Sequence, residues 1–104
     1  MTRYAGKPFL RLLECYVLDA IGQLDDGTRS AMDSMEPKLA KVYQRQGTWQ
    51  EIVRGEMDFP PSFPETIRGF WGQYSAEMAR RGETIDANAF AMSFIDQNFP
   101  DIGS

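Results

Sequence analysis

The spacing of the apolar residues constrains this chain most, because they recur every three or four positions instead of every second one. That spacing places side chains along one face of a helix, whereas strict alternation is typical of a strand. The pattern is clearest near the start, at Phe9, Leu10, Leu12, Leu13, Tyr16, Val17, Ala20, Ile21 and Leu24. No segment shows sustained alternation, so the sequence predicts an all-α fold.

The periodic stretches and the turn residues between them predict a compact irregular bundle of five or six helices. The expected helices span 8–24, 28–46, 49–54, 63–81 and 86–98. Pro37 interrupts the second range, and a proline inside a helix removes a backbone hydrogen bond. We therefore expect this helix to kink or to split near 34–37. A length of 104 residues suits a single domain, 1–104, with one core.

Several polar residues stand where helices are expected to start. Thr28, Ser34 and Asp86 can each cap a helix by accepting a hydrogen bond from a free backbone amide. Thr48-Trp49-Gln50-Glu51 and Ser62-Phe63-Pro64-Glu65 both fit the capping box, in which a hydroxyl and a carboxylate satisfy two such amides. These signals set the predicted starts of the helices.

The first helix has a wide apolar arc, which predicts that it runs through the middle of the bundle. Only the side that carries Arg11, Glu14, Cys15 and Gly22 is expected to face solvent. Cys15 has Arg11 one turn earlier, but Glu14 and Asp19 oppose its effect on the thiol. We interpret Cys15 as an inert thiol.

Composition excludes several kinds of site. The chain has no histidine and one cysteine, which rules out histidine-based catalytic pairs, an intrachain disulfide and a cysteine-based metal cluster. The neighbouring acids Asp25-Asp26, and Glu56 with Asp58, do not match the spacing of a calcium-binding loop. We expect no catalytic residues, no metal and no cofactor.

Charge and hydropathy indicate the class of partner. The net charge is −4, so nucleic acid and anionic membrane are poor partners and a basic protein is a better one. No apolar run approaches the roughly 20 residues of a membrane-spanning helix. The N-terminal segment lacks the pattern of a secretory signal, and we expect a cytoplasmic protein.

The proline-rich segment around Phe59-Pro60-Pro61-Ser62-Phe63 is the main predicted loop. Two aromatic residues beside two acids, in a segment expected at the surface, are what a site for a basic partner needs. We predict partner binding by Glu56, Asp58, Phe59 and Phe63. The alternative is that the loop aromatics fold back onto the core.

One face of the 63–81 helix carries small residues, Gly69, Gly72 and Ala76, which can admit another helix closely. That helix can come from the same chain or from a second one. The sequence therefore favours a small acidic noncatalytic protein-binding protein, such as a bacterial immunity protein or antitoxin that neutralises a larger effector. The alternatives are a scaffold subunit or homo-oligomer that uses the small-residue face, and third a regulatory protein that binds nucleic acid.

Overall fold

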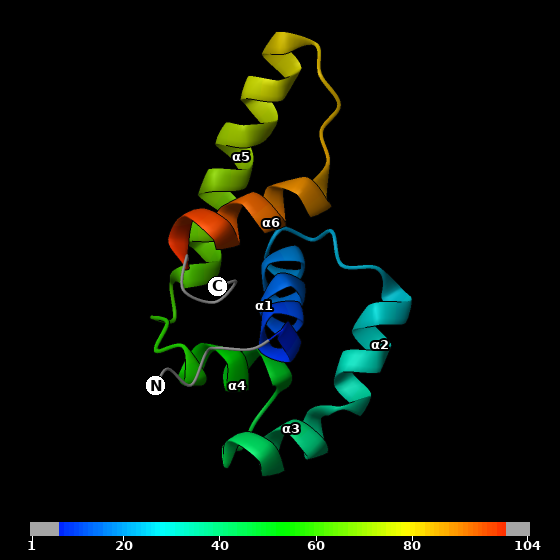
Figure 1. Ribbon diagram of the computed structural model, residues 1–104, viewed down its shortest axis with the longest axis vertical. Coiled ribbons are helices and arrows are strands. Elements are labelled where there is room, and N and C mark those ends of the chain that lie inside the picture. The colour runs from blue at the N-terminus through cyan, green and yellow to red at the C-terminus, as the bar shows by residue number, and fades with distance from the viewer. Residues whose placement is uncertain (1–6, 100–104) are drawn as a thin grey trace.

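The computed structural model describes residues 7–99, and all regular structure in that part of the chain is helical. The helices are α1 (Lys7–Ala20), α2 (Asp26–Ser34), α3 (Glu36–Tyr43), α4 (Trp49–Glu56), α5 (Phe63–Arg81) and α6 (Ala87–Asn98). The helices form one globule. Because every regular element of the described residues is a helix, the all-α prediction is confirmed. Figure 1 shows α1 at the centre, α4 and α6 crossing near its two ends, and α2 and α3 to one side.

Helix α1 supplies the middle of the core and packs against α4, α5 and α6. Leu13 and Val17 are completely buried. The completely buried side chains of the other three helices are Trp49, Ile52, Val53, Ile67 and Ala91. Cys15 was expected to face solvent, but only 1% of it is exposed. The prediction was wrong because α2 stands opposite that side of α1: Leu12 and Cys15 line one concavity together with Thr28 and Met32 of α2.

The first helix ends at Ala20, four residues before the predicted end. Gly22 has a φ of +72°, and its amide donates to the Asp19 carbonyl, while the Gln23 amide donates to the Leu18 carbonyl. This is a Schellman turn, in which a left-handed glycine reverses the chain. Leu24 remains buried after the turn, so its apolar character reflects the core and not a continuing helix.

The second predicted helix is split into α2 and α3 at the predicted place, with Pro37 in the first turn of α3. Helix α2 starts at Asp26, because Asp25 accepts hydrogen bonds from both the amide and the hydroxyl of Thr28. Asp25, not Thr28, is thus the cap. Ser34 does not cap α3 either, since its hydroxyl donates to the Ser30 carbonyl one turn back. Helix α3 ends at Tyr43, three residues before the predicted end, where Gln44 is left-handed.

Helices α4 and α5 start at the predicted residues, although α4 continues two residues beyond its predicted end, and α6 starts at Ala87, directly after its predicted cap Asp86. The Thr48 hydroxyl accepts from the Glu51 amide at 3.2 Å, and the Asp86 carboxylate accepts from the Asn88 amide at 3.0 Å. The cap predicted at Ser62 was wrong. Its side chain makes no capping bond, because Ser62 has helical φ and ψ angles and only its carbonyl accepts from Glu65 and Thr66.

Helix α5 is the longest helix and the least buried. It has the predicted bounds and ends at Gly82, whose φ of +71° again allows a Schellman turn. Only Ile67 of its 19 residues is buried. Figure 1 shows the second half of α5 projecting beyond the rest of the molecule before the chain returns to α6. Among the described residues, no helix has the length and apolar character needed to cross a membrane.

Candidate functional site

The two aromatic residues predicted for the binding loop lie together and rest against the core. Phe59 and Phe63 stack with their ring centroids 4.1 Å apart. Phe59 also contacts Tyr16 of α1 at a centroid distance of 5.7 Å. Both phenylalanines are partly buried. Each therefore contributes part of its surface to the core and leaves the rest exposed.

The end of α4 explains why Phe59 turns inward. Asp58 has a φ of +59°; its amide donates to the Gly55 carbonyl, and the Phe59 amide donates to the Arg54 carbonyl at 2.8 Å. This is the Schellman geometry seen after α1, with aspartate in place of glycine. The turn directs the chain back toward α1. The expected open loop is thus a tight helix end followed by a short turn.

The two acids predicted for the same site have different environments. Glu56 is the last residue of α4 and is only 8% exposed, and the Nε of Arg45 donates to its Oε2 at 3.3 Å. Asp58 is exposed. The structure thus brings Phe59 and Phe63 into contact and leaves Asp58 at the surface beside them. Glu56 instead pairs with Arg45, which lies in the segment between α3 and α4.

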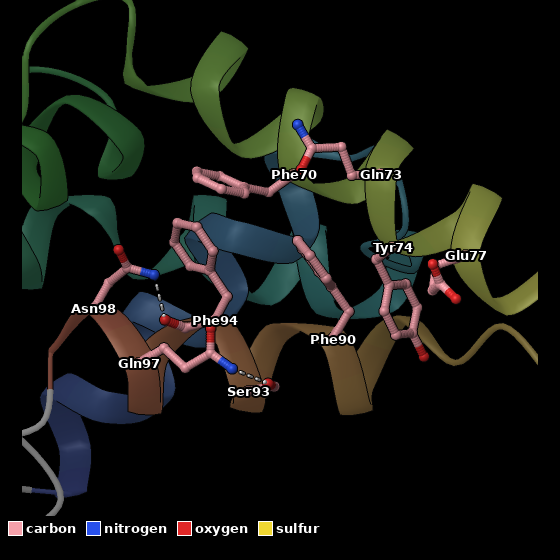
Figure 2. Close-up of a pocket in the computed structure, with 9 residues that line it drawn as sticks. All are labelled: Phe70, Gln73, Tyr74, Glu77, Phe90, Ser93, Phe94, Gln97 and Asn98. Carbon is pink, nitrogen blue, oxygen red and sulfur yellow. Dashed lines mark hydrogen bonds between the residues drawn. The ribbon is translucent and has the colours of Figure 1, made fainter.

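A second concavity, with both aromatic and polar walls, lies between α5 and α6. Figure 2 shows this groove, which has a volume of about 550 Å³ and is lined by Phe70, Gln73, Tyr74, Glu77, Phe90, Ser93, Phe94, Gln97 and Asn98. Its aromatic rings contact one another: the centroids of Phe70 and Phe94 are 5.8 Å apart, and those of Tyr74 and Phe90 are 5.4 Å apart. Phe70 is 46% exposed, so an apolar edge of the groove is open to solvent.

Uncharged polar groups line the sides of this groove. Gln73 comes from α5, and Ser93, Gln97 and Asn98 come from α6 (Figure 2). The Gln97 amide donates to the Ser93 hydroxyl, and the Asn98 amide donates to the Phe94 carbonyl. The side-chain carbonyls of Gln97 and Asn98 retain their capacity to accept hydrogen bonds.

The charged residue in the groove, Glu77, is part of a local network of ion pairs. Glu77 pairs with Arg80 and with Arg81, whose Nε donates to it at 2.8 Å. Hydrogen bonds from Arg80, which has the larger effect, and from Arg81 lower the pKa of the Glu77 carboxyl group. The groove therefore joins an aromatic floor to polar edges, the composition of a surface that binds an apolar segment and orients it with a few hydrogen bonds.

The small residues of α5 do not pack against another helix of this chain. Gly69, Gly72 and Ala76 are exposed. A Cβ atom built on Gly69 or Gly72 meets no heavy atom within 4 Å. The close contact expected within the chain is therefore absent from the described residues, and a contact between chains stays a prediction.

The described residues offer little for catalysis. Burial raises the pKa of the Cys15 thiol, which keeps it protonated and unreactive near neutral pH. No cluster of three or more carboxylate or thiol groups that could hold a metal ion occurs in the part of the chain that the structure describes.

Sequence reasoning did not find the α5–α6 groove. Its floor comes from Phe70 and Tyr74 on one helix and from Phe90 and Phe94 on the next, in each case one turn apart. The spacing was visible, but the same spacing is expected of residues packed in a core. Comparisons with protein-family models, with curated proteins and with solved structures find no match to this chain.

Proposed function

We propose that this protein is a noncatalytic protein-binding domain, and that its α5–α6 groove holds an apolar segment of a partner protein. The observation that carries the proposal is a groove of about 550 Å³ with four aromatic residues in its wall, of which Phe70 is 46% exposed. Phe90 and Phe94 are themselves buried, so Phe70 is the exposed member of the cluster. An exposed aromatic side chain beside other rings is a typical anchor of a protein interface.

The wider setting that suits this domain best is a bacterial immunity protein or antitoxin in the cytoplasm, which neutralises a larger effector. The net charge of −4 supports a basic partner, since long-range attraction speeds the encounter of oppositely charged proteins. The same charge makes nucleic acid a poorer partner. Asp58, Phe59 and Phe63 offer a second, smaller surface for the same partner; Phe63 joins it to the groove through Phe94, at a centroid distance of 6.1 Å.

A homo-oligomer or scaffold subunit is the second candidate function. It is favoured by the open space over Gly69 and Gly72, where a second helix meets no steric obstacle. In this case the occupant of the small-residue face is a second copy of the chain, and light scattering gives a mass above that of the 11.8 kDa monomer.

The binding proposal is tested with a tagged protein, identification of its captured partner, and measurement of binding kinetics with the purified pair. Phe70→Ala is expected to raise the dissociation rate about tenfold or more, as loss of an interface hot spot does. The matched control is Val42→Ala, which also truncates an exposed apolar side chain, 62% exposed, but on α3. It is expected to leave the kinetics unchanged.

Variants of the loop separate the two surfaces. Asp58→Asn removes the charge while keeping a residue that tolerates the left-handed conformation. It is expected to slow association slightly and to leave dissociation unchanged, because a charge near the edge acts mainly through steering. If Asp58→Asn and Phe63→Ala abolish binding while Phe70→Ala has no effect, the proposed groove is wrong and the partner binds the loop.

A further inference from the structure

A smaller cavity lies on another part of the molecule, where the end of α1 meets α4 and the start of α5. It has a volume of about 140 Å³ and shares no lining residue with the α5–α6 groove. Tyr16 and Asp19 come from α1, Gln50 and Arg54 from α4, and Arg68 from α5. Three helices thus converge on one cavity with polar and charged walls.

The two arginines at this cavity differ from the other arginines of the described chain. Each of the others pairs with a carboxylate: Arg11 with Glu14, Arg29 with Asp19, Arg45 with Glu56, and Arg80 and Arg81 with Glu77. Arg54 and Arg68 have no carboxylate partner among the described residues. Both are in the wall of the same cavity.

Arg68 is positioned by the backbone. Its Nη1 donates to the carbonyl of Ala20 at 3.3 Å, at the C-terminal end of α1, where a cation is favourable. A guanidinium has five N–H donors in a planar fork, so this bond leaves most of them available. Arg54 is partly buried and has no side-chain hydrogen bond to any described residue. The cavity wall therefore carries the guanidinium of Arg54 and the remaining N–H donors of Arg68 without an acceptor among the described residues.

The one carboxylate at the cavity is already occupied. Asp19 pairs with Arg29, and its Oδ2 accepts a hydrogen bond from the Gln50 amide at 3.2 Å. Its negative charge is thus balanced by a third arginine, which is not part of the cavity wall. The charges of Arg54 and Arg68 remain uncompensated, and they make this cavity electropositive in a protein whose net charge is −4.

Tyr16 adds a buried donor with no acceptor. The residue is only 3% exposed, and its hydroxyl has no hydrogen-bond partner in the described part of the molecule. A buried polar group without a partner is uncommon and destabilising. Burial raises the pKa of Tyr16, and the positive charge of Arg54 acts against that rise. The phenol is therefore protonated near neutral pH and lies within electrostatic reach of Arg54.

We infer that this cavity binds a small oxyanion, the phosphate or carboxylate group of a small molecule, between Arg54 and Arg68, with the Tyr16 hydroxyl as a further donor. Guanidinium groups match both anions because two parallel N–H groups can bind two oxygens of one group. The ligand pairs with both arginines at once, and the Tyr16→Phe variant below decides whether the buried hydroxyl reaches it. This site is independent of the proposed partner groove.

The test measures thermal unfolding of the full chain against increasing inorganic phosphate and, separately, against succinate, with sodium chloride keeping the ionic strength constant. A ligand that binds only the folded state raises Tm as its concentration increases. We expect a saturable rise with one or both anions and none when chloride replaces them. Saturation by phosphate alone identifies a phosphate site, and saturation by succinate alone identifies a carboxylate site. The absence of saturation with both anions overturns the proposal.

Two charge-matched variants test the location. Arg54→Gln is expected to weaken the affinity about tenfold or more, because hydrogen bonds to a charged group are among the stronger ones. Arg80→Gln removes the same charge from the exposed end of α5 and is expected to keep the affinity. Equal losses in both variants mean that the anion responds only to overall charge, which contradicts the site. Arg68→Gln provides the same comparison from α5 if Arg54→Gln folds poorly.

Tyr16→Phe removes the hydroxyl group, the third proposed donor to the anion, without changing the charge of the protein. Without anion, this variant is expected to be at least as stable as the wild type, since it removes an unpaired buried hydroxyl. With saturating anion, the wild type is expected to gain more in Tm than the variant. An equal gain in both shows that the hydroxyl takes no part. Chemical-shift changes at Gln50 and Arg54 in ¹⁵N NMR spectra provide an independent measure of the position.

Discussion

Helices α1 and α5 both carry a stripe of large apolar residues, but the structure uses the two stripes differently. In α1 the stripe is buried from Phe9 to Leu18, and α4, α5 and α6 all pack against the helix. In α5 only Ile67 is buried, while Phe70 is 46% exposed. Phe63, Trp71 and Tyr74 are partly buried against the core, so Phe70 is the exposed part of the stripe. Apolar surface that other helices cover stabilises the fold, whereas apolar surface left exposed is available to a partner.

The two helices differ in burial because of their positions in the fold and not because of their amino-acid composition. Helix α1 is at the centre and has neighbours on several sides, whereas α5 extends past the last element that could cover it (Figure 1). Apart from α1, which packs on its buried part, the described helix beside α5 is α6, and the two leave the groove between their aromatic side chains (Figure 2). The comparison predicts that substitutions in α1 affect folding and that equivalent substitutions in α5 affect binding.

The largest expected difference is between Leu13→Ala and Phe70→Ala. Leu13 is completely buried, so Leu13→Ala is expected to lower the free energy of unfolding by about 2–5 kcal/mol. Phe70→Ala removes a larger side chain, but one that is already half exposed, and is expected to cost about 1 kcal/mol. Urea denaturation followed by circular dichroism measures both. Equal costs would show that the stripe of α5 belongs to the core.

A smaller difference in stability is expected between alanine variants of Thr48 and Ser62. The sequence predicted that both residues cap a helix, but only Thr48 does so. Thr48→Ala is expected to cost about 1 kcal/mol, because the hydroxyl accepts from the Glu51 amide at the start of α4. Ser62→Ala, at the start of α5, is expected to change stability by less than about 0.5 kcal/mol, since no capping bond is lost. Thermal unfolding of the two variants in one buffer checks this. A larger loss for Ser62→Ala contradicts the observed cap geometry.

The sequence predicted helices well where a local signal decides the conformation. The bounds of α5 follow from Pro64 in its first turn and from Gly82 after Arg81, and each acts through its own backbone preferences. The split at Pro37 has the same origin. These features depend on a few neighbouring residues, so they can be predicted without knowledge of the tertiary structure.

The sequence failed where the outcome depends on contacts between distant segments. Nothing local indicates that Asp58 adopts the left-handed conformation that turns Phe59 onto Tyr16, because that contact joins α1 to a residue about 40 positions later. Burial of Cys15 depends on α2, and pairing of Glu56 depends on Arg45. The groove likewise depends on the angle between α5 and α6, which the spacing of their aromatic residues does not determine.

The smallest expected effect concerns the bare face of α5. Gly72 is exposed within the helix, and a Cβ atom there meets no neighbour within 4 Å. Gly72→Ala is therefore expected to raise the free energy of unfolding by about 0.5–1 kcal/mol, since alanine loses less backbone entropy than glycine on entering a helix.

The control for this substitution is Gly82→Ala, which changes the same atoms at the end of the same helix. Gly82 has a φ of +71°, where a side chain is strained even in open space, so Gly82→Ala is expected to destabilise the protein by about 1 kcal/mol. Light scattering and unfolding at several protein concentrations complete the test. A gain for Gly72→Ala that is independent of concentration indicates a face exposed to solvent in the monomer. A loss that appears only where the wild type is dimeric indicates that a second chain packs on Gly72, and α5 then resembles α1 in having its surface covered, but by another molecule.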